Sequence, residues 1–135
     1  MTTGYSGTPL AKKLNLRDGQ SVWFENMPET VIDEIDEYAL ELTFVSDPAG
    51  GVDAIHLFST RRAELEERLP QFREQMSSDG QIWVSWPKKA SKVDTDITED
   101  TIREVCLPLG LVDTKVCAID ETWSGLKLVI RKELR

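Results

Sequence analysis

The near-continuous apolar run from Val52 to Phe58 constrains the fold more than any other part of the sequence. A strand with one face in water alternates apolar and polar residues, whereas Ala54-Ile55-His56-Leu57-Phe58 is apolar at almost every position. Such a run is typical of a parallel strand covered on both faces. Parallel neighbours need long crossover connections, usually helices, and the flanking sequence alternates between strand-like and helix-like patterns. The sequence therefore predicts an α/β fold with helices on both faces of a mostly parallel sheet.

Apolar periodicity and turn residues divide the rest of the chain into short elements. Thr98 is placed to cap one helix. Ser59-Thr60, with Glu64 in reach for a capping box, is placed to cap another helix, which Pro70 is expected to kink. The connection 120–125 is short enough for an antiparallel hairpin. The expected strands are 21–27, 40–45, 52–58, 81–86, 113–119 and 126–132, and the expected helices are 8–14, 29–38, a segment ending near residue 76, and 99–109.

Composition limits the classes of function. The formal net charge of −8 argues against general nucleic-acid binding, which relies on Lys and Arg. Cys106 and Cys117 form neither a disulfide framework nor a recognisable metal-binding spacing, and they suit a reducing compartment. The first residues do not resemble a secretory signal, and no apolar run approaches the roughly 20 residues of a membrane span. We expect one cytoplasmic domain over residues 1–135, monomeric or homodimeric, without metal or membrane contact.

Three segments carry a resemblance to class I methyltransferase folds. Residues 15–22 (NLRDGQSV) resemble the lead-in to the first strand of that fold, and 52–58 with 77–85 resemble its fourth and fifth strands. The final hairpin is similar to its terminal antiparallel strand. The resemblance implies a three-layer, Rossmann-like sheet of six strands in the order 2-1-3-4-6-5, with strand 6 reversed. Residues 1–14 would form an N-terminal arm and a short helix.

A more specific resemblance rests on four further segments. They are 4–14 (GYSGTPLAKKL), 86–89 (WPKK), 110–117 (GLVDTKVC) and 120–126 (DETWSGL). In these segments the chain is similar to a short bacterial family catalogued as domain of unknown function 3052. The resemblance spans nearly the whole chain, but it implies a family without implying an activity.

The loop after the first expected strand lacks the residues that a nucleoside cofactor needs. In methyltransferase and dinucleotide folds this loop is glycine-rich, so that the backbone can approach the ligand. Here residues 25–30 read Glu-Asn-Met-Pro-Glu-Thr, without glycine, and Pro28 removes one backbone donor. We therefore expect no S-adenosylmethionine and no other cofactor. Asp47 could imitate an acid that holds a ribose, but a turn aspartate before Pro48 is the more ordinary interpretation.

The densest basic segment of this acidic chain follows the fourth expected strand. Lys88, Lys89 and Lys92 come after Trp86-Pro87, and Arg61 with Arg62 follows the third strand. Open α/β sheets bind ligands at the carboxyl ends of their strands. These cations could attract a phosphate or carboxylate there. A solvated loop explains them equally well.

Two other segments could contribute to the same edge. In the arm 4–13, Ser6 and Thr8 could present hydroxyls to an anion, although a capped helix with Tyr5 as an anchor is the simpler interpretation. In the hairpin loop 120–125, Asp120 and Glu121 could act as acid and base and Trp123 could stack on a ligand. A plain hairpin with a packed Trp123 accounts for the loop as well.

Nucleophilic chemistry has little support in the sequence. His56 is the sole histidine and lies within an apolar strand, so a core position is favoured over a role as a base. Cys106 lies beside Val105 and Leu107 on an apolar helix face and Cys117 lies on a strand, and both are expected to be buried thiols.

The sequence leads to three alternatives for function. The first is a non-catalytic module that binds a small anionic ligand or a protein at the carboxyl edge of the sheet. The second is a small enzyme that acts on an anionic metabolite with Lys88 or Lys115 and Asp120 or Glu121. The third is a structural subunit that acts through dimerisation. The residues expected to bind a ligand are Tyr5, Ser6, Thr8, Asn26, Arg61, Trp86, Lys88, Lys89, Lys115, Asp120 and Trp123.

Overall fold

The strands form a mixed sheet in the order β2-β1-β3-β4-β6-β5. The computed structural model describes residues 7–135. β2, β1, β3 and β4 run parallel, β6 is antiparallel to β4, and β5 is antiparallel to β6. The predicted α/β class, strand order and C-terminal hairpin are confirmed. The strands are β1 (Ser21–Glu25), β2 (Thr43–Phe44), β3 (Val52–Phe58), β4 (Met76–Pro87), β5 (Leu111–Ala118) and β6 (Trp123–Ile130).

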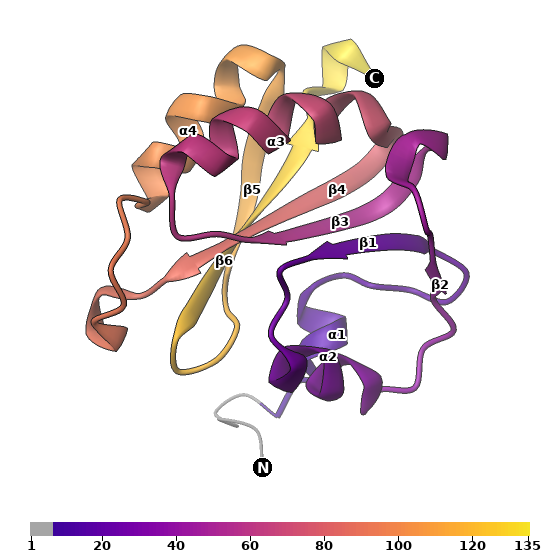
Figure 1. Cartoon of the computed structure of the whole chain (residues 1–135). Coiled ribbons are helices and arrows are strands. Elements are labelled where there is room, and N and C mark those ends of the chain that lie inside the picture. Colours follow the sequence, from indigo (N-terminus) through magenta and orange to yellow (C-terminus); the bar gives the residue numbers. More distant parts are fainter. Residues whose placement is uncertain (1–6) are drawn as a thin grey trace.

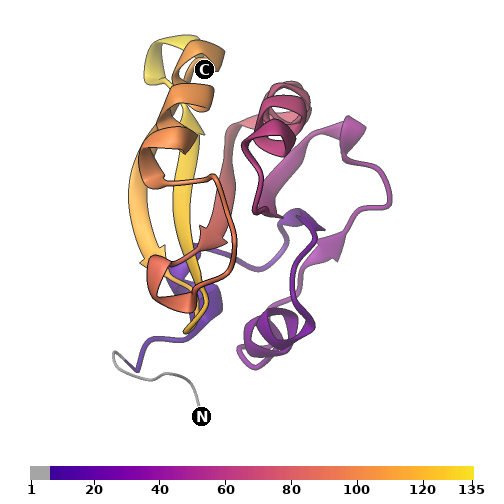
Figure 2. The same ribbon diagram turned by 60° about the vertical axis from the view of Figure 1, so that its left-hand side comes forward.

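Helices cover both faces of this sheet (Figure 1). α3 and α4 lie on one face, and α1 and α2 lie on the other; α2 stays on the side opposite to α3 when the molecule is turned (Figure 2). Within residues 7–135, no helix combines the length and apolar character needed to cross a bilayer. The helices are α1 (Leu10–Lys13), α2 (Glu29–Asp36), α3 (Arg62–Gln75) and α4 (Glu99–Cys106), with 3₁₀ turns η1 (Pro48–Gly50), η2 (Lys89–Ser91), η3 (Leu107–Leu109) and η4 (Lys132–Leu134).

β3 contributes to two separate cores, one on each face of the sheet. Its Ile55 and Leu57 join the core under α3 and α4, whereas Ala54 and Phe58 join the core under α1 and α2. Successive side chains of a strand point to opposite faces. The near-continuous apolar run at 52–58 is therefore apolar because both faces of β3 are covered.

Several element boundaries differ from those expected. β2 is only two residues long, because Thr43 and Phe44 pair with just the first two residues of β1. Leu40 and Leu42, expected in that strand, instead pack as loop side chains on the core under α1 and α2. β4 begins at Met76, so the expected turn at residues 78–80 belongs to the strand. The pairing of β3 with β4 shifts register between Val52 and Ala54, which accommodates this early start.

The two predicted helix caps have different outcomes. Thr98 caps α4 and forms a reciprocal capping box with Thr101. The cap expected from Ser59-Thr60 is wrong: Arg61 occupies the cap position of α3 without a side-chain cap. The Ser59 hydroxyl donates to the Glu64 carboxylate instead, at 2.5 Å. The amide of Arg62 donates to Asp96, which is remote in sequence, at 2.7 Å.

The short helix α1 is held at its C-terminal end by side chains of the sheet. Gln81 and Trp83 of β4 both donate to the Leu14 carbonyl, at 2.8 and 3.0 Å. Lys115 of β5 donates to the Lys13 carbonyl at 2.6 Å. A helix of four residues has no independent stability in water. These bonds therefore position the segment that leads from α1 into β1.

Candidate functional site

The loop after β1 is crossed by the side chain of Asn26. This residue adopts a left-handed backbone conformation, with φ of 59°. Its Nδ2 donates to the Phe58 carbonyl at 3.3 Å and to the Glu64 carboxylate at 3.2 Å. Asparagine is among the few residues that adopt this conformation readily. The amide thus connects the end of β1 to the end of β3 and to the first turn of α3.

A bidentate ion pair closes the same edge further along α3. Arg68 donates through Nε and Nη2 to the two oxygens of Glu25, each at 2.7 Å, and Trp23 donates to the same carboxylate at 3.0 Å. Burial alone would raise the pKa of Glu25, but these donors hold that pKa below its ordinary value. The end of β1 is therefore connected to α3 by two sets of side-chain bonds.

The predicted residues of the hairpin lie together and bond to one another. Lys88 donates through Nζ to the Asp120 carbonyl at 2.6 Å. One carboxylate oxygen of Asp120 accepts from the amides of Thr122 and Trp123, at 2.8 Å each. Trp123 packs edge-on against Phe58, with ring centroids 5.0 Å apart. These contacts form the structure of the loop itself.

The other predicted residues are dispersed. Arg61 pairs with Asp94 at 2.5 Å on the exposed surface, and Lys89 is exposed on η2. Trp86 is buried in the core under α3 and α4, on the opposite face from Trp123. Thr8 lines a separate hollow beside α2. Tyr5 and Ser6 lie outside the described residues.

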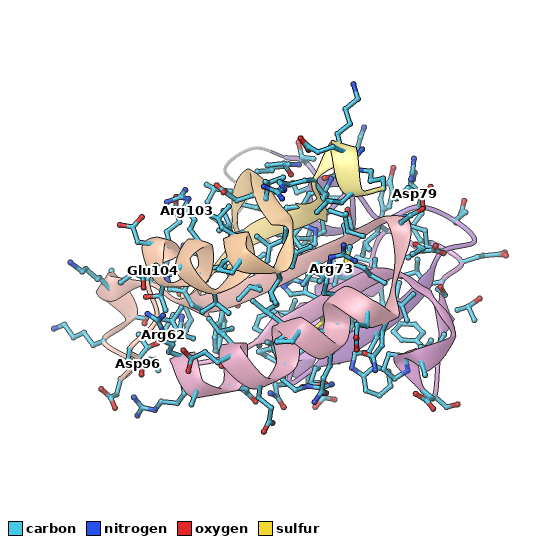
Figure 3. All side chains as sticks on the ribbon, turned by 90° about the horizontal axis from the view of Figure 1, so that it is seen from above. Arg62, Arg73, Asp79, Asp96, Arg103 and Glu104 are labelled. Carbon is cyan, nitrogen blue, oxygen red and sulfur yellow. The ribbon has the colours of Figure 1, made fainter. Side chains whose placement is uncertain are left out.

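A larger hollow lies at the opposite, amino-terminal edge of the sheet. It has a volume of about 360 Å³ and is formed by the α1–β1 connection and by β3, β4 and β6. In Figure 3, Asp79 of this hollow is at the far end of the sheet from Arg62 and Asp96. An adjoining hollow of about 310 Å³ shares part of its wall. The first hollow is lined by Lys12, Asn15, Leu16, Arg17, Gln20, Asp53, Asp79, Gly80, Gln81, Lys127 and Val129.

Positive charge collects along one side of this hollow. Lys127 of β6 stands directly opposite Lys115 of β5 in the strand pairing. Lys127 donates to the neutral Oδ1 of Asn15 at 3.1 Å. Burial, together with the charges of Lys115 and Arg17, lowers the pKa of Lys127. Within residues 7–135, no ion pair involves Lys12, Arg17 or Lys127.

Asp53, which also lines the hollow, accepts hydrogen bonds from neutral local donors. One carboxylate oxygen accepts from the amide and the hydroxyl of Ser21, at 2.9 and 3.2 Å, and the other accepts from Ser77 at 3.3 Å. Asp53 is thus hydrogen-bonded within the fold, and it forms no ion pair with the described residues.

Sequence reasoning selected Lys115, which does not line the hollow, and did not select Arg17 or Lys127, which do. Lys127 alternates with Leu126 and Leu128, which is the ordinary pattern of a strand with one face in water and gives no signal of a site. β6 lies between β4 and β5, as the resemblance implied, but the residues that share the hollow with Lys127 come partly from the distant α1–β1 connection. Arg17 carries no signal either, because it lies in a polar turn.

The groups most suited to nucleophilic or acid–base chemistry are in the cores. His56 is 2% exposed and its Nε2 is 2.7 Å from the Ser85 hydroxyl; burial lowers the pKa of His56 to about 3. Burial raises the pKa of Cys106 to about 11 and also raises the pKa of Cys117. No cluster of three His, Cys, Asp or Glu suited to a metal ion occurs in the described part of the chain.

Comparison with known proteins places the chain in a class and then in a family. The fold is methyltransferase-like, as the match to solved structures of methyltransferases shows. The chain belongs to the family described as "Protein of unknown function (DUF3052)", whose model matches residues 11–132. A search of curated proteins found no match.

Three of the similar structures illustrate the relationship. A putative type 11 methyltransferase from Sulfolobus solfataricus has a TM-score of 0.60 and 13% identity, with 91% of this chain and 90% of that one covered. A TehB-like SAM-dependent methyltransferase from Corynebacterium glutamicum has a TM-score of 0.55 and 10% identity, with 96% and 91% covered. Fibrillarin from Aeropyrum pernix, with natively bound S-adenosyl-L-methionine, has a TM-score of 0.52 and 10% identity, with 90% and 69% covered. At these identities the likeness shows the fold alone.

Proposed function

We propose that this protein is a non-catalytic binding module on a methyltransferase-like scaffold whose cofactor edge is closed. The observation that carries the proposal is the Asn26 side chain, which is bonded to the Phe58 carbonyl and to Glu64. In sheets of this class the cofactor lies at the carboxyl ends of the strands, beside the loop after the first strand. Asn26 occupies that loop.

The residues at this edge do not fit S-adenosylmethionine. A glycine-rich loop lets the backbone approach a nucleoside and provides free amides. Here the Asn26 side chain is in that place, and Pro28 has no amide to offer. Opening the edge would break both Asn26 bonds, at about 1 kcal/mol each, and would disturb the half-buried ion pair between Glu25 and Arg68. We therefore derive no methyl-transfer step for this protein.

The alternative of a small enzyme has less support at the same edge. Its acid–base pair would combine Lys88 or Lys115 with Asp120 or Glu121. The ammonium groups of Lys88 and Lys115 each bond to a backbone carbonyl, and the Asp120 carboxylate bonds to two backbone amides. An acid–base pair needs titratable groups that reach a reacting atom. Lys88 and Asp120 hold the hairpin loop instead, and Lys115 holds the end of α1.

Isothermal titration calorimetry with S-adenosylmethionine and S-adenosylhomocysteine tests the proposal. We expect no saturable heat with either compound at millimolar concentration, because the bonded Asn26 side chain lies in the loop after β1 and Pro28 offers no amide. A dissociation constant in the micromolar range would overturn the proposal. The same titration of Asn26→Gly shows whether the side chain alone excludes the cofactor; binding that appears only in this variant supports the proposal.

A stability measurement isolates the contribution of Asn26. We expect Asn26→Gly to lower the free energy of unfolding by about 1 kcal/mol, since the loss of two hydrogen bonds outweighs relief of the left-handed backbone. Ala39→Gly is the matched control, because Ala39 has φ of 55° and an exposed side chain. The control should be neutral or stabilising in urea unfolding. Equal effects of the two variants would show that the amide bonds contribute nothing.

A further inference from the structure

The hollow at the amino-terminal edge is lined by Lys12, Arg17 and Lys127 and by the carboxylates of Asp53 and Asp79, and within the described residues these cations form no ion pair. The chain as a whole carries a net charge of −8, so anionic partners for lysines are abundant on its surface. Arg61, Arg62 and Arg103 each use one or more of them. Within the described residues, Arg17 and Lys127 use none.

The cross-strand pair of Lys115 and Lys127 makes this arrangement costly. Like charges directly opposite on neighbouring strands destabilise a sheet, and these two residues are register partners. Lys115 is relieved in part by the Lys13 carbonyl, at 2.6 Å. Lys127 is half-buried, and among residues 7–135 its hydrogen-bond partner is the neutral Asn15 oxygen. A charge that is removed from water without an ionic partner is unfavourable unless a ligand supplies one.

The size and the lining of the hollow indicate what kind of ligand would fit. Its volume of about 360 Å³ lies at the lower end of the range of small-molecule sites, which runs from about 300 to 1,000 Å³. Arg17 and Lys127 line it together with the exposed carboxylate of Asp79. A ligand in it would meet the cations of Arg17 and Lys127 as well as the carboxylates of Asp53 and Asp79, which accept hydrogen bonds.

We propose that this hollow is the ligand site of the module and that it binds a small metabolite with a phosphate or carboxylate group. The inference rests on the proposed function and specifies its site. The anionic group would lie between Arg17 and Lys127, where guanidinium and ammonium groups form charge-assisted hydrogen bonds with oxyanions. Hydroxyl or amino groups of the ligand would face Asp79.

Nuclear magnetic resonance of the whole ¹⁵N-labelled chain tests this site. Inorganic phosphate and acetate are titrated separately at constant ionic strength, so that the two sources of an oxyanion are distinguished. We expect saturable shifts of the Gly19 and Gly80 amides with at least one of the two anions. Saturable shifts confined to the carboxyl edge, around Lys88 and Lys89, or the absence of saturable shifts, would overturn the inference.

Charge-removing variants make the test specific. Arg17→Gln and Lys127→Gln are each expected to weaken anion binding at least tenfold. Lys132→Gln removes a charge of the same kind from the exposed turn η4 and should leave binding unchanged. Equal weakening in all three variants would show a general charge effect and would overturn the inference. Because Arg17 is an exposed turn residue, Arg17→Gln tests the site even if Lys127→Gln does not fold.

The two proposals can fail separately. Binding of S-adenosylmethionine at the Asn26 edge would refute the binding-module proposal whatever phosphate and acetate do. An unresponsive hollow in a protein that also ignores S-adenosylmethionine would refute only the site inferred here.

Discussion

At the scale of single residues, His56 shows how burial changes the chemistry of a side chain. It stacks on Phe58 at a centroid distance of 4.6 Å and bonds to Ser85. Burial favours the neutral ring and lowers the pKa to about 3. In the unfolded chain the pKa returns to about 6.5. Between these two values the unfolded state binds more protons than the folded state.

Because the unfolded state binds more protons, the free energy of unfolding should decrease as the pH falls. The contribution of His56 to stability is complete above pH 6.5 and is lost as the pH falls towards 3, by at most about 1.4 kcal/mol per pH unit. Urea unfolding between pH 7 and 5 should show it as a decrease of about 1–2 kcal/mol. The double variant His56→Leu, Ser85→Ala should have a flatter profile, whereas Ser85→Ala alone should keep the slope. Parallel profiles for all three proteins would rule out His56 as the cause.

At the scale of secondary-structure elements, the start of β4 depends on a glycine that has close neighbours. A Cβ on Gly80 would lie 2.9 Å from the Ser77 hydroxyl and 3.0 Å from the carbonyl oxygens of Asp53 and Ser77. Two of these atoms belong to the backbone and cannot rotate away. The register shift between β3 and β4 falls in the same region. The close approach of the two strands therefore requires a residue without a side chain.

We expect Gly80→Ala to lower the free energy of unfolding by about 1–3 kcal/mol, the usual cost of overpacking. Gly50→Ala is the matched control, because a Cβ at Gly50 has no atom within 4 Å and its φ is not positive. Its effect should be within about 0.5 kcal/mol. Chemical denaturation of the three proteins gives the comparison. A Gly80→Ala variant as stable as the control would mean that β4 moves without cost.

At the scale of the whole molecule, the sheet separates two cores, and each contains one thiol. Cys106 is fully buried under α3 and α4, and Cys117 is 7% exposed in the core under α1 and α2. Burial raises the pKa of both thiols, which lowers the fraction of reactive thiolate. β3 and β4 supply side chains to both cores, so neither core can be lost alone without disturbing the other.

Thiol labelling can test this coupling. With an aromatic disulfide reagent at pH 7.5, we expect both cysteines to react at one slow rate, which rises with urea as global unfolding does. Mass spectrometry should show unlabelled and doubly labelled protein with little singly labelled species. Accumulation of protein labelled only at Cys117 would show that the edge strand β5 opens independently of the rest.

Much of the fold could be predicted from local sequence. The apolar run at 52–58, the capping threonine Thr98 and the short connection at 120–125 depend on near neighbours, and resemblance supplied the strand order. The length of β2 and the early start of β4 depend on which strand lies alongside, and these were not predicted. The Ser59-Thr60 cap failed because Asp96, remote in sequence, receives the helix amide.

The sequence by itself determined the α/β class, the covered central strand and the absence of glycine from the loop after β1. Only the tertiary structure decided how the charged residues are used. Pairing of β5 with β6 sets Lys115 against Lys127, and the docking of α1 brings Arg17 to the same hollow. Periodicity and composition indicate which faces of a segment are apolar, because that pattern is written in neighbouring residues. A binding site combines side chains from segments that are distant along the chain, and their meeting is set by packing.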